Sequence, residues 1–113
     1  MSKISDQVFL DYLFKYQASE NFKLPKGAAY QLQIESAPNP TKRMQFNIKF
    51  FSDEWGNDHL CPAKLAMECL DLYNSGMKEP KDYRNKTGRK PRSRRGNYLL
   101  PVLQKIEAAL EPN

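Results

Sequence analysis

The sequence predicts an α+β fold, because it contains two kinds of hydrophobic periodicity. Residues 30–35 and 43–51 alternate apolar and polar side chains, which is typical of strands with one buried face. Residues 4–18, 62–75 and 97–110 place apolar side chains three and four positions apart, which is typical of amphipathic helices. The predicted order is therefore helix, strand, strand, helix, helix.

The first predicted helix spans residues 4–18. Ser2 or Ser5 is suited to cap it, since a serine hydroxyl accepts a hydrogen bond from the free N–H groups of a first turn. One face of this helix collects the apolar side chains of Ile4, Val8, Phe9, Tyr12, Leu13 and Tyr16. We expect this face to cover the core or a partner subunit.

Two arrangements are open for the strands. The turn at residues 36–41 contains Pro38 and Pro40, which cannot continue a sheet. Residues 30–35 and 43–51 either pair as a hairpin within one chain, or the second segment pairs with its own copy in a second subunit.

The second strand has an unusual polar face. Its side chains alternate between an apolar set and a polar set, with Met44, Phe46, Ile48 and Phe50 on one side and Arg43, Gln45, Asn47 and Lys49 on the other. The polar set contains two amides and two cations but no acid. In the major groove of DNA, amide side chains match the edge of adenine and cations match the acceptors of guanine. This face is therefore suited to reading bases.

The remaining helices follow two loops. Residues 52–60 form an acidic, irregular loop, after which Pro62 suits a first helical position and Gly76 a helix stop. The last helix has two open starts. In the first, Asn97 caps the helix and Pro101 lies in its first turn. In the second, Pro101 is itself the first helical residue.

The segment Gln45-Phe46-Asn47-Ile48-Lys49-Phe50 resembles the strand of the ribbon-helix-helix (MetJ/Arc) family of DNA-binding proteins. The resemblance implies a homodimer in which this strand pairs antiparallel with its copy, and two helices follow the intersubunit ribbon. It assigns contacts with DNA bases to Gln45, Asn47 and Lys49. An N-terminal helix and connector, residues 1–29, would be added to a ribbon-helix-helix-like domain, residues 30–113, that contains an extra strand and a basic loop at residues 77–96.

The positive charge of the chain is concentrated in one segment. The net charge is +5, but residues 76–97 hold nine Lys or Arg and two acids, so the rest of the chain has a net charge of −2. Such a run has three interpretations: a solvated loop without a partner, an arm that lies along phosphates, or a segment that enters the minor groove of DNA. We favour the interpretations with a polyanionic partner. The start of the last helix adds free N–H groups that suit phosphate. The expected contacts with the DNA backbone are Lys42, Arg43, Arg89, Lys90, Arg92, Arg94, Arg95 and Asn97.

Other functions have little support in the sequence. His59, Cys61 and Cys69 lack the paired spacing of zinc ligands, and the nearby acids lie on a loop without a phosphate-orienting lysine. We therefore expect no metal, no cofactor and no enzymatic activity. The chain also has no apolar run that could span a membrane and no signal-peptide core, which favours a cytoplasmic protein with reduced cysteines.

The sequence thus predicts a sequence-specific regulator of transcription that binds double-stranded DNA, with the transcription machinery as a further partner. By resemblance, such a protein is often encoded on a plasmid, a phage or another mobile element. Two alternatives stay open. One is an RNA-binding module that uses an intrachain hairpin and the basic loop. The other is a small interaction or inhibitor protein that uses the acidic loop around residues 53–58.

Overall fold

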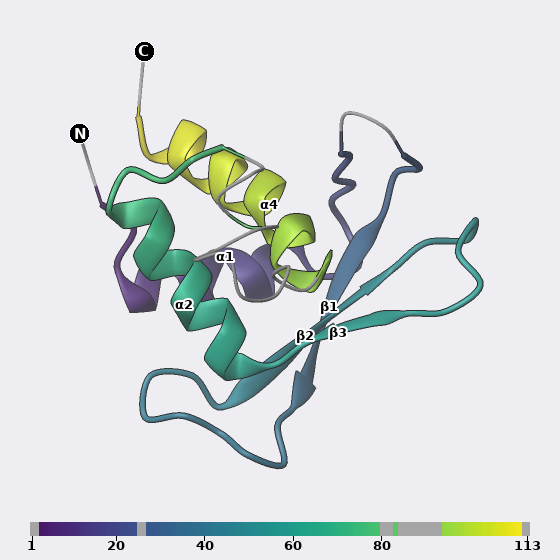
Figure 1. Ribbon diagram of the computed structural model, residues 1–113, viewed down its shortest axis with the longest axis horizontal. Helices are drawn as coiled ribbons and strands as arrows, with labels where there is room; N and C mark the ends of the chain where they lie inside the picture. The colour runs from purple at the N-terminus through teal and green to yellow at the C-terminus, as the bar shows by residue number, and fades with distance from the viewer. Residues whose placement is uncertain (1–2, 25–26, 80–82, 84–93, 112–113) are drawn as a thin grey trace.

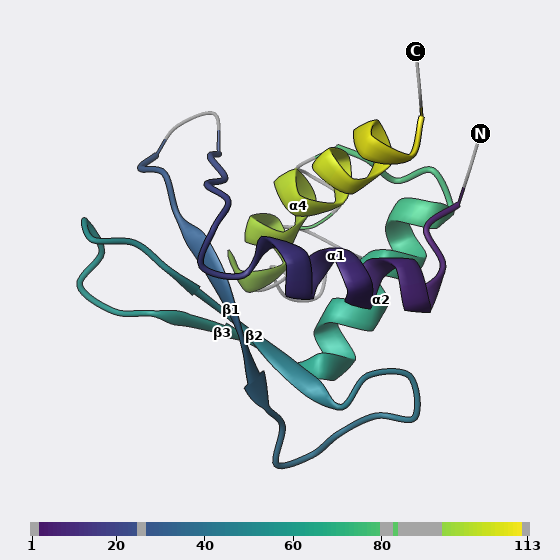
Figure 2. The same ribbon diagram turned by 180° about the vertical axis from the view of Figure 1, so that it is seen from behind.

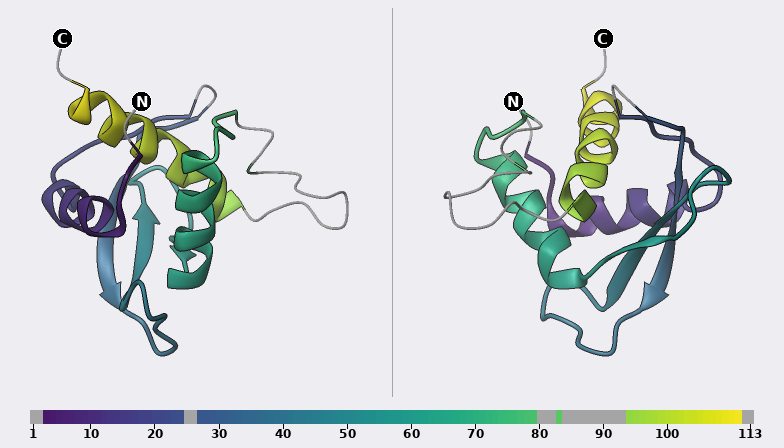
Figure 3. Two further views of the ribbon diagram at one scale, coloured as in Figure 1. Left: turned by 90° about the vertical axis from the view of Figure 1, so that its left-hand side faces the viewer. Right: turned by 45° about the vertical axis from the view of Figure 1, so that its right-hand side comes forward.

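The computed structural model describes residues 3–24, 27–79, 83 and 94–111. Its elements, in chain order, are α1 (Asp6–Tyr16), β1 (Gln31–Ser36), β2 (Phe46–Phe51), β3 (His59–Cys61), α2 (Ala63–Asn74) and α4 (Arg94–Leu110). The described helices lie on one face of the sheet, with α1 against β1, α2 against β2 and α4 against β3 (Figures 1 and 3). The predicted α+β class is confirmed.

The sheet is antiparallel and has β2 at its centre. β1 pairs with β2 from Gln31 opposite Phe51 to Ser36 opposite Phe46, so the intrachain hairpin is the arrangement that forms. On the other edge of β2, the register places Ile48 opposite Cys61. A strand needs a free edge to accept another neighbour, and β2 has neighbours of its own chain on both edges. The expected ribbon between two subunits is therefore not part of this fold.

β3 was not predicted from the sequence. This strand has only three residues and lies at the end of the stretch predicted to be an irregular loop. Three residues are too short to establish a period of two. The strand forms because its neighbour β2 offers a hydrogen-bonding edge, which is a tertiary effect.

The start of α1 and the end of α2 follow the predicted chemistry. Ser5 caps α1, since its hydroxyl accepts a hydrogen bond from the N–H of Val8 at 3.2 Å. Gly76 ends α2 with a left-handed φ of 99°, and the N–H of Met77 reaches back to the carbonyl of Leu72 at 3.1 Å. Pro62 was predicted to be the first helical residue of α2, but it is the N-cap residue, and the helix begins one position later at Ala63.

The last helix differs from both predicted starts. α4 begins at Arg94 and contains Pro101 in its interior. Because proline has no N–H, the carbonyl of Asn97 loses its helical partner at that turn. The next carbonyl, that of Tyr98, accepts a hydrogen bond of 2.6 Å from the hydroxyl of Tyr30. This contact from the start of the sheet helps to stabilise the interrupted end of the helix.

One hydrophobic core joins the sheet to the described helices. Its fully buried side chains include Phe9, Leu13, Tyr30, Leu32, Ile48, Phe50, Leu70, Leu99, Leu103 and Ile106. The helix of the predicted N-terminal segment therefore shares a core with the rest of the chain. The rings of Tyr30, Phe50, Trp55 and Tyr98 pack together over the sheet, with centroid distances of 4.9 to 5.8 Å.

The Tyr30 hydroxyl can be tested by removing it alone. Tyr30→Phe should lower the free energy of unfolding by about 1–2 kcal/mol, because the buried carbonyl of Tyr98 loses the hydrogen bond from this hydroxyl. Tyr12→Phe is the matched control, since no hydrogen bond of its hydroxyl is found in the described chain. Urea denaturation measures both. Equal effects of the two variants would contradict the assigned role.

Candidate nucleic-acid interface

Lys49, predicted to contact bases, faces two acids of its own sheet. Its Nζ lies 3.1 Å from a carboxylate oxygen of Glu35 on β1 and 3.9 Å from one of Asp58 in the turn before β3. Gln33, Lys49 and Leu60 stand side by side across the three strands. Around Lys49 the open face of the sheet therefore has one cation and two acids, and it does not attract phosphate as the sequence pattern predicted.

Asn47 is buried, and the prediction that its amide points outward to bases was wrong. Only 8% of the residue is exposed. Its Oδ1 accepts a hydrogen bond of 3.1 Å from the N–H of Ala63, the first residue of α2. Because Pro62 has no side-chain donor or acceptor, this amide from the neighbouring strand serves as the helix cap.

Gln45 is exposed but lies outside the strand. It precedes β2 in the loop that joins β1 to β2, and its Nε2 donates to the carbonyl of Thr41 at 2.7 Å. Asn47, buried, and Lys49, in ion pairs, do not share a reading face with it. The three predicted base contacts are therefore not brought together.

Arg43 is also engaged within the molecule. Its guanidinium donates to both carboxylate oxygens of Asp6 at 2.7 and 2.8 Å, and to both oxygens of Asp71 at 2.8 Å. These bonds connect the start of α1, the loop before β2 and the last part of α2. Hydrogen bonding from Arg43 lowers the pKa of Asp6 below its ordinary value, and the two carboxylates raise the pKa of Arg43. The predicted backbone contact by Arg43 is thus replaced by an intramolecular clamp.

Lys42 and Lys64 are exposed cations at this end of the sheet. Neither has an ion-pair partner within the described residues. Lys64 lies in the first turn of α2, which has no acid, and the loop with Lys42 runs beside that helix end (Figures 1 and 2). Free N–H groups and lysines at the positive end of a helix favour an anion.

The basic segment is attached to the fold at the points that the structure describes. Lys78 Nζ lies 2.6 Å from Glu107 on α4, which also accepts a bond of 2.7 Å from the hydroxyl of Tyr73. These two contacts lower the pKa of Glu107. Tyr83 is fully buried and its hydroxyl donates to the carbonyl of Met77 at 2.8 Å.

The predicted contacts Arg89, Lys90 and Arg92 lie outside the described residues. Arg94 and Arg95 belong to the first turn of α4, which contains no acid. Asn97, predicted as a cap and a phosphate contact, lies inside this turn instead. Its Oδ1 is buried and has no hydrogen-bond partner.

An aromatic cluster next to the start of α4 was not predicted. Trp55 lies 5.1 Å from His59 and 4.9 Å from Tyr98, and His59 lies 5.1 Å from Tyr98, between ring centroids. The three residues come from a loop, a short strand and a helix, so no local periodicity marks them. The clustered rings fix the end of α4 at which the basic segment returns to the fold.

Within the described residues, no group of three or more His, Cys, Asp or Glu side chains is arranged to hold a metal ion. Among the helices of that same part of the chain, none has the length and apolar character needed to cross a membrane. Comparisons with family models, with curated proteins and with solved structures find no match to this chain.

The capping role of Asn47 predicts a stability effect. Asn47→Ala should lower the free energy of unfolding by about 1 kcal/mol, because α2 loses the acceptor for its first N–H. Asn47→Asp should keep the cap, since a carboxylate also accepts this bond and suits the positive helix end. Gln33→Ala, an exposed change on the neighbouring strand, is the control. A neutral result for Asn47→Ala in urea denaturation would argue against the cap.

The Arg43 clamp predicts a dependence on pH. Arg43→Ala should lower stability at pH 7 by at most about 1 kcal/mol, because the partners are largely exposed. The pKa of Asp6 is lowered from 3.8 in the folded protein, so its contribution is present above pH 3.8 and is lost as the pH falls through the folded value. The stability difference between the two proteins should therefore shrink below pH 3.8. Urea titrations between pH 2.5 and 7 test this, and a constant difference would exclude it.

Proposed function

We propose that this protein binds double-stranded DNA through the phosphate backbone, with residues 76–97 as the main contact. The observation that carries the proposal is the distribution of charge. Between residues 84 and 96 the sequence has no acid and seven cations, namely Arg84, Lys86, Arg89, Lys90, Arg92, Arg94 and Arg95. When such a run binds a polyanion, condensed counterions are released, and this release favours binding.

Ion pairing elsewhere in the fold supports this assignment. Arg43, Lys49 and Lys105 each lie within 4 Å of a carboxylate, and the chain outside residues 76–97 has a net charge of −2. Cations that are already paired would lose those partners on binding phosphate. The net excess of positive charge is therefore concentrated in residues 76–97.

Two helix starts add anion-binding groups. The first turns of α2 and α4 contain Lys64 and the pair Arg94 and Arg95, with no acid in either turn. Cations at a positive helix end weaken an isolated helix, and a bound phosphate would reverse this effect. α1, which has Asp6 in its first turn, shows the usual arrangement.

The proposal does not use β2 to read bases. Asn47 is a helix cap and Lys49 is held by acids, so a contact with base edges would require both to leave their partners. Backbone contacts position a protein on a duplex but carry no sequence information by themselves. A role in transcription remains part of the proposal and depends on whether selection from random DNA enriches a motif. A homodimer would need a surface other than the edges of β2.

RNA is the second candidate ligand, and the intrachain hairpin of β1 and β2 favours it. The RNA-binding alternative requires that hairpin, and the register from Gln31 to Ser36 provides it. Double-stranded RNA is recognised mostly through shape, phosphate and 2′-hydroxyl contacts rather than through base edges. Parallel titrations with DNA and RNA duplexes of one sequence compare the two ligands.

The basic segment predicts a change in salt dependence. The triple variant Arg89→Gln, Lys90→Gln, Arg92→Gln should weaken duplex binding for all sequences alike. Each lost phosphate contact should reduce the slope of log K against log salt by about 0.9. Fluorescence anisotropy at several salt concentrations measures this slope.

The control removes the same charge from another surface. Lys3, Lys15 and Lys23 are exposed and lie outside the basic segment. Their triple replacement by Gln should leave the slope close to that of the unmodified protein. Equal slopes for both triple variants would contradict the proposed interface.

A further inference from the structure

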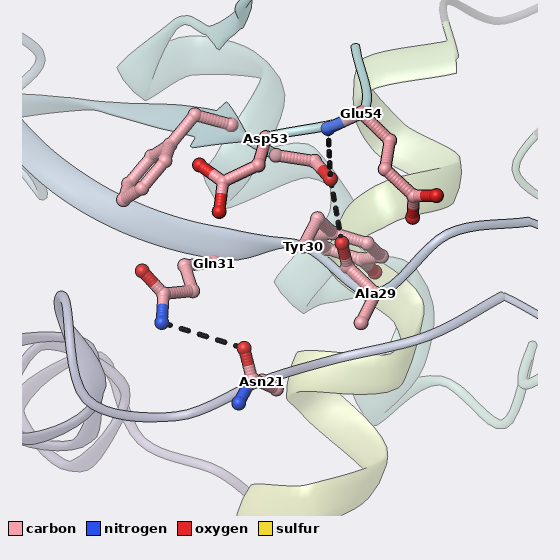
Figure 4. A pocket seen from close by; sticks show the side chains of 8 residues that line it. Asn21, Ala29, Tyr30, Gln31, Asp53 and Glu54 are labelled. Atoms are coloured by element: carbon pink, nitrogen blue, oxygen red, sulfur yellow. Dashed lines mark hydrogen bonds between the residues drawn. The ribbon is translucent and has the colours of Figure 1, made fainter.

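A pocket lies at the end of the sheet where β1 begins and β2 ends. Its volume is about 290 Å³, and its lining residues are Asn21, Ala29, Tyr30, Gln31, Phe51, Ser52, Asp53 and Glu54. They come from the connector after α1, the start of β1 and the turn after β2 (Figure 4). This is the end of the sheet opposite the loop that carries Lys42.

Hydrogen bonds between the walls set the shape of the pocket. The hydroxyl of Ser52 donates to the carbonyl of Ala29 at 2.7 Å and accepts from the N–H of Glu54 at 3.3 Å. Across the opening, Nε2 of Gln31 donates to Oδ1 of Asn21 at 3.4 Å. The turn after β2 is thus fastened to the segment just before β1, and the pocket does not depend on a single flexible side chain.

The connector that forms the far wall is also held by backbone bonds. Phe22 and Tyr30 exchange two hydrogen bonds of 2.8 Å in an antiparallel bridge. Both residues are buried in the core, and their rings lie 6.0 Å apart. Asn21 and Ala29, which flank this bridge and line the pocket, are therefore fixed relative to each other.

Two acids and no base line the pocket, together with two aromatic residues, Tyr30 and Phe51. Asp53 and Glu54 have no ion-pair partner within the described residues, whereas six other carboxylates lie within 4 Å of Lys or Arg: Asp6, Glu20, Glu35, Asp58, Asp71 and Glu107. Asp53 lies on the side of Gln31, and Glu54 on the side of Ala29 (Figure 4). Phe51, half-buried, stands opposite Gln31 in the sheet register and adds an apolar surface.

We propose that this pocket binds a guanidinium or primary ammonium group carried on a short aliphatic chain. The carboxylates of Asp53 and Glu54 would accept the charged donors, and the ring of Phe51 would contact the methylene groups. The volume lies at the lower end of the range for small-molecule sites, so it suits one small cation or one side chain. A negative pocket disfavours phosphate, and this site is therefore separate from the proposed nucleic-acid interface.

The ligand chemistry has two sources, a free amine or an arginine side chain of another protein. Calorimetric titration with agmatine tests the free form, and N-butylurea provides a neutral control of similar shape. A short peptide with one arginine, compared with its glutamine version, tests the protein form. Tighter binding of agmatine assigns the site to a free amine, and tighter binding of the peptide assigns it to a partner protein.

Two variants locate the site. Asp53→Asn and Glu54→Gln should each weaken agmatine binding about tenfold, as expected for the loss of one charge-assisted hydrogen bond. Asp58→Asn is the matched control, because it removes one charge from the same turn but does not line the pocket. Its affinity for agmatine should stay within about twofold of that of the unmodified protein. All three residues are exposed, and thermal unfolding checks that each variant folds.

Three results would overturn the proposal. The first is no binding of agmatine or of the arginine peptide up to millimolar concentration. The second is equal loss of affinity in Asp53→Asn and Asp58→Asn, which would indicate general attraction to an acidic turn. The third is equal binding of magnesium ions and agmatine, which would assign the carboxylates to a metal ion. None of these results depends on whether the protein binds DNA.

Discussion

The central position of β2 is the constraint on which the rest of the structure depends. Its apolar side chains Ile48 and Phe50 are fully buried under the described helices, while both of its edges are paired with strands of the same chain. An inner strand cannot offer its backbone to a second copy or insert into a groove without breaking a ladder. The same segment that suggested a base-reading ribbon is therefore the foundation of the core, and its polar side chains serve the fold. Asn47 starts α2, and Lys49 links β1 to the turn before β3.

Much of the fold could be predicted from local patterns. The period of 3.6 in α1 and α2, the serine cap and the glycine stop are properties of short windows, and the structure has each of them. The alternation in residues 43–51 identified a strand correctly. Alternation indicates which face of a strand is buried, but it does not indicate which strands pair with it. Whether a strand is an edge or an inner strand depends on β3, whose three residues have no periodic signal of their own. The start of α4 was missed because Pro101 is tolerated inside the helix, where the hydroxyl of Tyr30 donates a hydrogen bond to the nearby carbonyl of Tyr98.

The candidate site was less predictable for a related reason. A sequence shows which hydrogen bonds and ion pairs a polar side chain could make. Its neighbours in the fold determine which of its donors and acceptors stay free for a ligand. The guanidinium of Arg43 suits phosphate, but it is already hydrogen-bonded to Asp6 and Asp71, which are far from Arg43 in the sequence. The concentration of charge after residue 76 is visible without any structure, since a count of charges needs no geometry. The pocket beside β1 needed the fold, because three distant segments form it and no motif marks them.

The proline inside α4 has a mechanical consequence. At Pro101 the helix lacks one rung of its ladder, so the turn that begins with Arg94 is joined to the remaining turns less firmly than in an uninterrupted helix. Tyr98, in contrast, ties that turn to the sheet through its carbonyl and its ring. A force applied to the chain just before Arg94 would therefore be resisted mainly by the contacts of Tyr98 with the aromatic cluster and the sheet, and only weakly by the part of α4 after Pro101.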